Sequence, residues 1–177
     1  MFDFFKYIIA FLNKNNIAYM LSGSVAMSIY VLPRATRDFN FVVNLHEGDI
    51  HLLVDHFKEG YYCDNDAVKD AVQRKSMFNI IDYASGYKAD FVILKDEDFR
   101  ITEFNRKTQA DFFGTPVYIV SPEDLLLSKL IWIQQLQSAI QKDDIINLAA
   151  ITNLDKAYVN FWIDKLNLNT FGLLNND

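Results

Sequence analysis

The chain has 177 residues, of which 51% are hydrophobic and 23% are charged, and its net charge is −6. These values exclude disorder, collagen-like repeats and coiled coil as the main organisation, and the length predicts one principal core. The negative charge excludes a broad DNA-binding surface. A local site for one triphosphate or one RNA end is still compatible with it, because such a site needs only a few cations.

The cysteine count, the first residues and the length of the apolar runs all bear on the compartment of the protein. Cys63 is the single cysteine, so it cannot form an intramolecular disulfide. Asp3 and Lys6 lie among the first phenylalanines, which is not the layout of a secretory signal. The longest apolar runs, such as residues 7–12, are far shorter than the roughly 20 residues that span a bilayer. We therefore expect a cytoplasmic protein with no membrane partner.

The front of the chain alternates helical and extended patterns. Apolar residues spaced three and four apart predict a helix over residues 2–15, and a short apolar run predicts a strand over residues 17–21. Gly23 ends that strand just before a helix over residues 24–31. The following segments are expected to be a strand over 39–43, helices over 49–58 and 64–74, and hairpins pairing 77–83 with 88–94 and 104–113 with 115–120.

From Ser121 onward the pattern is helical, with segments expected over residues 122–137, 138–151 and 155–166. The sequence thus predicts an α/β (α+β) fold, in which a mixed sheet is flanked by helices. We expect residues 1–120 to form the α/β core. Residues 121–177 should form a helical segment packed on that core, within one compact unit.

One candidate phosphate site is the turn Ser22-Gly23-Ser24. A strand that turns through glycine into a helix directs free backbone N–H groups and the positive helix end at one spot. This arrangement suits a phosphate, although an ordinary connection between a strand and a helix has the same sequence.

A candidate metal site follows at Asp38 and Asn40. Residues two apart on a strand share a face, with Cα atoms roughly 6–7 Å apart, so their side-chain oxygens can approach one cation. Asp90, in a strand that can lie beside the first, adds a further carboxylate. Together with the glycine turn these residues outline a site for Mg²⁺ and a triphosphate. The alternative is that Asp38 pairs with Arg34 or Arg37 and that Asp90 ends an exposed face.

A cation in the helical segment is also a candidate. At 100° per residue, Lys129 falls within the apolar arc of Leu125, Trp132, Ile133 and Leu136. Its ammonium either snorkels to an edge or reaches into a cleft toward an anionic substrate. Asp144 on the next helix can pair with it, as part of the structure or of a site.

The order of these motifs resembles that of the nucleotidyltransferase superfamily, which has a polymerase-β-like fold, and especially its small bacterial branch of AbiEii-type and MNT-type toxin–antitoxin proteins. The matching residues are the Gly23 turn, the segment 34–40, Asp90 and the start of the helical segment at 121–130. The resemblance covers about residues 4–166. It implies transfer of an NMP from an NTP to an acceptor such as a protein or a tRNA.

The resemblance also implies residue roles. Gly23, Ser24 and Arg37 would bind the nucleotide, assisted by Lys129 and Asp144. Asp38, Asn40 and Asp90 would be catalytic and would hold Mg²⁺ or Mn²⁺. A cognate toxin or antitoxin would be a partner.

Asn40 departs from the family pattern, which has a metal-binding aspartate there. The substitution removes one negative charge beside the cation, and at 4 Å and an effective dielectric of about 20 a unit pair is worth roughly 4 kcal/mol. Two functions therefore fit the sequence. One is an active nucleotidyltransferase with a weakened metal ligand at Asn40. The other is a nucleotidyltransferase fold without catalysis that binds a nucleotide or a partner, for example in a toxin–antitoxin pair.

Overall fold

A computed structural model describes residues 2–33 and 35–174 of the chain. No helix in this part of the chain is both long and apolar enough to cross a membrane. The strands are β1 (Tyr19–Ser22), β2 (Asp38–Val43), β3 (Tyr61–Tyr62), β4 (Met77–Asp82), β5 (Lys88–Ile93), β6 (Thr108–Phe112) and β7 (Thr115–Ile119). They form one mixed sheet in the order β3-β4-β5-β2-β1-β7-β6.

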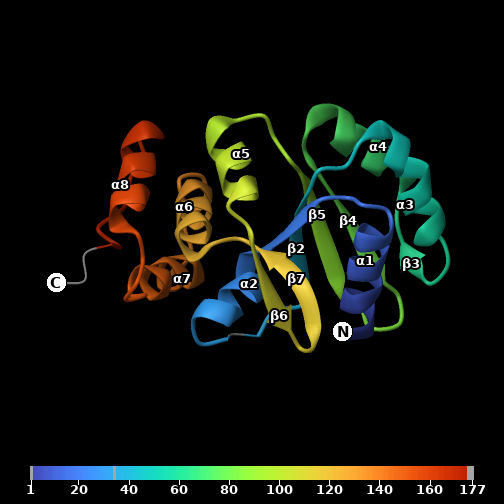
Figure 1. Cartoon of the computed structure of the whole chain (residues 1–177), viewed down its shortest axis with the longest axis horizontal. Coiled ribbons are helices and arrows are strands. Elements are labelled where there is room, and N and C mark those ends of the chain that lie inside the picture. Colours follow the sequence, from blue (N-terminus) through green and yellow to red (C-terminus); the bar gives the residue numbers. More distant parts are fainter. Residues whose placement is uncertain (1, 34, 175–177) are drawn as a thin grey trace.

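The helices other than α5 follow the expected order. They are α1 (Phe2–Lys14), α2 (Gly23–Tyr30), α3 (Ile50–His56), α4 (Asn65–Arg74), α5 (Asp98–Asn105), α6 (Pro122–Ile133), α7 (Ala139–Ala149) and α8 (Lys156–Lys165), with a short 3₁₀ turn at Glu47–Asp49 before α3. Figure 1 shows α6, α7 and α8 gathered at one end of the molecule and α1, α3 and α4 at the other. The sequence expectation of a mixed α/β fold is confirmed.

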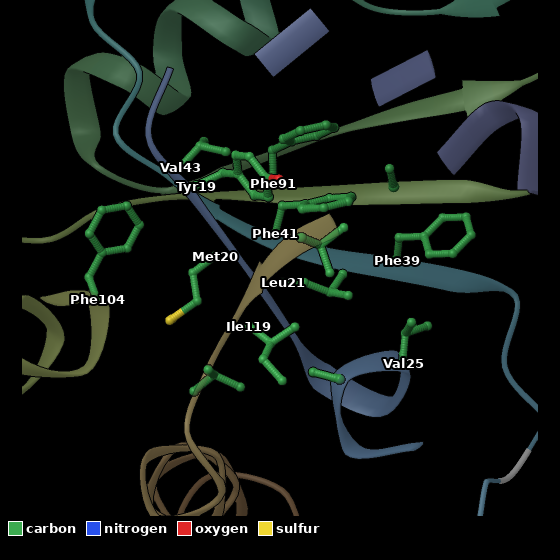
Figure 2. Close-up of a cluster of buried hydrophobic side chains, with 14 of the residues drawn as sticks. Tyr19, Met20, Leu21, Val25, Phe39, Phe41, Val43, Phe91, Phe104 and Ile119 are labelled. Carbon is green, nitrogen blue, oxygen red and sulfur yellow. The ribbon is translucent and has the colours of Figure 1, made fainter. Parts of the chain in front are cut away.

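Aromatic packing fixes one face of the central sheet. Alternation along β2 buries Phe39 and Phe41 and leaves the residues between them half-buried. The Phe41 ring stacks on Phe91 of β5 with centroids 5.4 Å apart, and Phe5 of α1 lies 5.1 Å from Phe39. Figure 2 shows Phe41 and Phe91 side by side on neighbouring strands. Because this face is filled by aromatic side chains, the intervening residues of β2 and β5 must face the other way.

Two expectations are wrong. Residues 98–105 form α5, so Phe104 lies in the last turn of a helix and does not begin a hairpin strand; the second hairpin starts only at Thr108. The apolar arc expected around Lys129 is the second: Trp132 is 59% exposed, and the buried face of α6 is formed instead by Leu125, Leu126, Leu127, Leu130 and Ile133. The helix ends at Ile133, and so Leu136 is not part of the arc expected around Lys129.

A buried polar network joins α8 to the rest of the molecule. Asp124, fully buried in the first turn of α6, accepts hydrogen bonds from Ser121 Oγ at 2.6 Å, Arg106 Nε at 2.9 Å and Tyr158 Oη at 2.6 Å. The Arg106 guanidinium also lies 4.0 Å from the centre of the Tyr158 ring. The carboxylate is thus fully satisfied, as a buried charge must be.

Candidate functional site

The glycine turn between β1 and α2 is closed on one side by Asn40. Gly23 has a φ of +67°, which side-chain-bearing residues rarely adopt. A Cβ at this position would lie 2.6 Å from Asn40 Nδ2 and 2.9 Å from Asn40 Cβ. The backbone of the turn therefore approaches the β2 side chain as closely as a glycine allows, which places the start of α2 beside Asn40.

Within the described residues, the start of α2 has no capping side chain at Ser22 and no acidic residue in its first turn. A helix start with these features has backbone N–H groups and a partial positive charge available to an anion. At the other end, Tyr30 donates a hydrogen bond of 2.6 Å to the carbonyl of Val120, and burial raises the pKa of this tyrosine to about 12. That bond fixes α2 against the segment that leads into α6.

A row of polar side chains crosses the sheet beside this turn. Asn40 pairs with Ser22 on one side and with Asp90 on the other, and Asp90 in turn pairs with Asn79 of β4. Residues directly opposite one another on neighbouring strands share a face. The sequence expectation that Asp90 lies beside Asn40 is confirmed, whereas Asn79 was not foreseen.

Asp90 does not end an exposed face, which corrects that alternative. The residue is only 6% exposed, and its Oδ2 atom forms an ion pair with Lys88 Nζ at a distance of 2.8 Å. Its Oδ1 atom is buried without a hydrogen-bond partner in the described structure. Lys88 was not singled out in the sequence. The signal that could have found it is its spacing, two residues before Asp90 on the same strand.

Asp38 lies at the start of β2, directly opposite Lys88. Its Oδ1 atom accepts a hydrogen bond from the Thr36 hydroxyl. Arg37 is exposed, and Arg34, the other expected partner of Asp38, lies outside the described residues. Asp38, Asn40 and Asp90 are thus brought onto the same face of two neighbouring strands. The two-residue spacing predicted this for Asp38 and Asn40.

These residues do not fit a metal centre of three carboxylates. Asn40 contributes a neutral amide, and the Asp90 carboxylate is already paired with Lys88. No group of three or more His, Cys, Asp or Glu side chains in residues 2–33 and 35–174 is placed to hold a metal ion. Mg²⁺ prefers carboxylate oxygens in octahedral geometry, and a nearby ammonium repels it.

Lys129 and Asp144 form an ion pair of 2.7 Å between α6 and α7, as expected for a cation on the buried side of α6. Asp144 is buried, and the side chain of Lys129 is only 16% exposed. The pairing is confirmed, whereas the role of either residue in nucleotide binding stays a prediction.

By sequence, the chain matches no family model and no curated protein. By structure, it is similar to several solved proteins. The lincosamide antibiotic adenylyltransferase LnuA is 14% identical, with a TM-score of 0.58 over 84% of this chain and 96% of that one. The antibiotic-resistance factor ANT(2'')-Ia, solved with adenylyl-2''-tobramycin, is 13% identical, with a TM-score of 0.65 over 93% of this chain and 95% of that one.

A third similar structure is an antigenic nucleotidyltransferase-like protein from Paracoccidioides brasiliensis, 15% identical, with a TM-score of 0.54 over 90% of this chain and 84% of that one. The chain therefore has the fold of the nucleotidyltransferase superfamily, as its motifs predicted. Its placement in the AbiEii/MNT-like branch stays a prediction.

Proposed function

We propose that the chain is a nucleotidyltransferase that moves the nucleoside monophosphate group of an NTP to a hydroxyl group of an acceptor. The observation that carries this function is the Gly23 turn, which places an uncapped helix start directly beside Asn40 and hence beside the row that contains Asp90. The fold supports the same assignment. Gly23 and Ser24 would hold the terminal phosphates through their backbone N–H groups.

The transfer requires a base. The acceptor oxygen forms a bond to the α-phosphorus, the bond from that phosphorus to the α,β-bridging oxygen breaks, and pyrophosphate leaves with the electron pair. The hydroxyl proton passes to Asp90 Oδ1, the buried carboxylate oxygen that has no partner in the described structure. Lys88 holds the other oxygen, which keeps the carboxylate in one orientation.

A small hydroxyl-bearing molecule is the acceptor class that the neighbours favour. LnuA was solved with lincomycin bound, and ANT(2'')-Ia with an adenylylated tobramycin. A protein or a tRNA is the acceptor that the sequence resemblance implies. The net charge of −6 favours the small molecule over tRNA, since RNA needs neutralising cations along its backbone.

The test is a transfer assay with each NTP labelled at the α-phosphate and with a panel of aminoglycosides, lincosamides, tRNA and protein acceptors, in Mg²⁺, in Mn²⁺ and in EDTA. We expect label on at least one acceptor. Asp90→Asn should lower the rate at least about 100-fold, because it removes the base. Asp96→Asn, which alters an exposed aspartate paired with Lys75, is the matched control and should leave the rate unchanged. No transfer with any pairing contradicts the proposal.

A second candidate function is a protein that binds a nucleotide or a partner, such as a cognate toxin or antitoxin, without catalysis. Asn40 and the Lys88–Asp90 pair favour it, because both reduce the negative charge available to a catalytic metal. It predicts no release of pyrophosphate from any mixture and, where the ligand is a nucleotide, saturable NTP binding. Pyrophosphate release by the wild-type protein would exclude it.

A further inference from the structure

The ion pair between Lys88 and Asp90 lies inside the candidate site. The two residues are two apart on β5 and share a face, and the register places Lys88 directly opposite Asp38. The ammonium therefore bonds to Asp90 from a residue that lies directly opposite Asp38 in the sheet. Its distance of 2.8 Å from a carboxylate that is 6% exposed is that of a direct, charge-assisted hydrogen bond.

We propose that Lys88 is the resident cation of this site, and that its ammonium takes the place at Asp90 that a divalent ion takes in a centre of three carboxylates. A triphosphate then binds without a divalent ion at Asp90. Triphosphate binding without a divalent ion rests on the proposed function, since it requires that a triphosphate binds here. The role of Lys88 as the cation at Asp90 does not.

The charges of the site support this role for Lys88. Three aspartates would present three negative charges to an incoming ion. Here Asp38 and Asp90 present two, Asn40 presents none, and Lys88 offsets one of the two. An ion arriving at Asp90 would have to displace an ammonium that is already bonded, and would be repelled by it at short range.

The neighbours of Asp90 fit a site with one fixed positive charge. The residues directly opposite it on both sides are amides, Asn40 on β2 and Asn79 on β4. An amide can donate and accept hydrogen bonds but cannot compensate a divalent charge. A lysine ammonium is a compact charge with three donors, so it can bond to Asp90 and still donate to a phosphate oxygen.

The first test measures Mn²⁺ binding to the nucleotide-free protein by calorimetry and by the electron paramagnetic resonance signal of free Mn²⁺. Two variants remove the charge: Lys88→Met keeps the length of the side chain, and Lys88→Gln keeps a hydrogen-bond donor for Asp90. Lys75→Met is the matched control, because Lys75 also pairs with an aspartate and is 42% exposed against 41% for Lys88.

We expect weak Mn²⁺ binding by the wild-type protein and by Lys75→Met, and an affinity at least about tenfold higher in a folded Lys88 variant. Adding Asn40→Asp to that variant should raise the affinity again. Equal Mn²⁺ affinity in the wild-type protein and in both folded Lys88 variants would overturn the inference, as would tight Mn²⁺ binding at this site by the wild-type protein.

A second measurement separates this inference from the proposed function. ATP, GTP, CTP and UTP are titrated into the same proteins in EDTA and in Mg²⁺. We expect the wild-type affinity to be nearly the same in both, and the Lys88 variants to lose affinity in EDTA. If no protein binds any nucleotide while the Lys88 variants gain Mn²⁺, the proposed function fails and the role of Lys88 at Asp90 stands. Wild-type binding that requires Mg²⁺ would overturn the inference while leaving the proposed function intact.

Discussion

Gly23 and Asn40 are packed so closely that a side chain on the first cannot coexist with the observed position of the second. A Cβ on Gly23 would lie 2.6 Å from Asn40 Nδ2 and 2.9 Å from Asn40 Cγ, well inside van der Waals contact. The glycine turn and the polar row on the sheet are thus in direct contact, and a side chain added at Gly23 must displace Asn40.

Gly23→Ala should therefore damage both stability and nucleotide binding. The strain of a positive φ costs about 1–2 kcal/mol and the clash adds about 1–3 kcal/mol, so we expect a loss of about 3 kcal/mol in the free energy of unfolding. Gly114→Ala is the matched control, because Gly114 has a φ of +74° but no atom within 4 Å of an added Cβ. It should lose only about 1–2 kcal/mol. Urea unfolding measures both, and equal losses would contradict the close packing.

Tyr158→Phe should weaken the attachment of α8. The variant removes the donor to Asp124 Oδ1, a fully buried carboxylate oxygen, and we expect a loss of about 1–3 kcal/mol in the free energy of unfolding. Tyr83→Phe alters an exposed tyrosine and should change the free energy of unfolding by less than about 0.5 kcal/mol. Indistinguishable urea midpoints for the two variants would show that the hydrogen bond does not stabilise the fold.

Glu103 should make stability depend on pH. Burial raises the pKa of Glu103, although Arg100 and Ser128 bond to its carboxylate. Because the folded-state pKa is above the unfolded value, the contribution of this group is fully present below the unfolded pKa and is lost as pH rises through the folded pKa. Glu103→Gln lacks this loss, so its stability relative to the wild-type protein should increase with pH.

The measurement is urea unfolding of Glu103→Gln and the wild-type protein at a series of pH values from acid to neutral. Glu97→Gln, which alters an exposed glutamate, is the matched control. If the stability of Glu103→Gln relative to the wild-type protein stays constant, or falls as pH rises, the prediction is wrong.

The Lys129–Asp144 pair should behave as a buried ion pair. Lys129→Met leaves Asp144 buried without this partner and should cost about 3–5 kcal/mol, whereas the double variant with Asp144→Leu should recover most of that loss. Measuring the NTP affinity of the double variant shows whether the pair binds nucleotide or only stabilises the fold. If the double variant is stable and binds NTP as the wild-type protein does, the predicted role of Lys129 and Asp144 in nucleotide binding is wrong.

The strands of the site could be predicted from the sequence because their signals are local. Alternation in β2 separated Asp38 and Asn40 from Phe39 and Phe41, and the glycine marked the end of β1. The helix α5 was missed because its buried face includes Glu103, a charged residue. Its carboxylate is bonded by Arg100 three residues earlier and by Ser128 on α6. The contact with Ser128 joins segments that are distant in the sequence, so it leaves no periodic signal in the chain.

Lys88 and Asn79 show why the chemistry of the site could not be predicted in full. Neither residue belongs to a recognisable motif. Asn79 lies opposite Asp90 in the β4–β5 hairpin, and Lys88 lies opposite Asp38 of β2, a segment distant in the sequence. The motif residues predicted where the site lies, whereas the sheet register determines which other side chains enter it. Lys88 and Asp90 lie two residues apart on β5, and this spacing alone does not show that they form an ion pair.

The most direct test of the proposed site is calorimetric titration of ATP, GTP, CTP and UTP into the wild-type protein and into Gly23→Ala, each in Mg²⁺ and in EDTA. The site predicts saturable binding of at least one nucleotide by the wild-type protein, retained in EDTA and lost in a folded Gly23→Ala. Absence of binding for all four nucleotides, or equal affinity in folded Gly23→Ala, would contradict a phosphate site at the Gly23 turn.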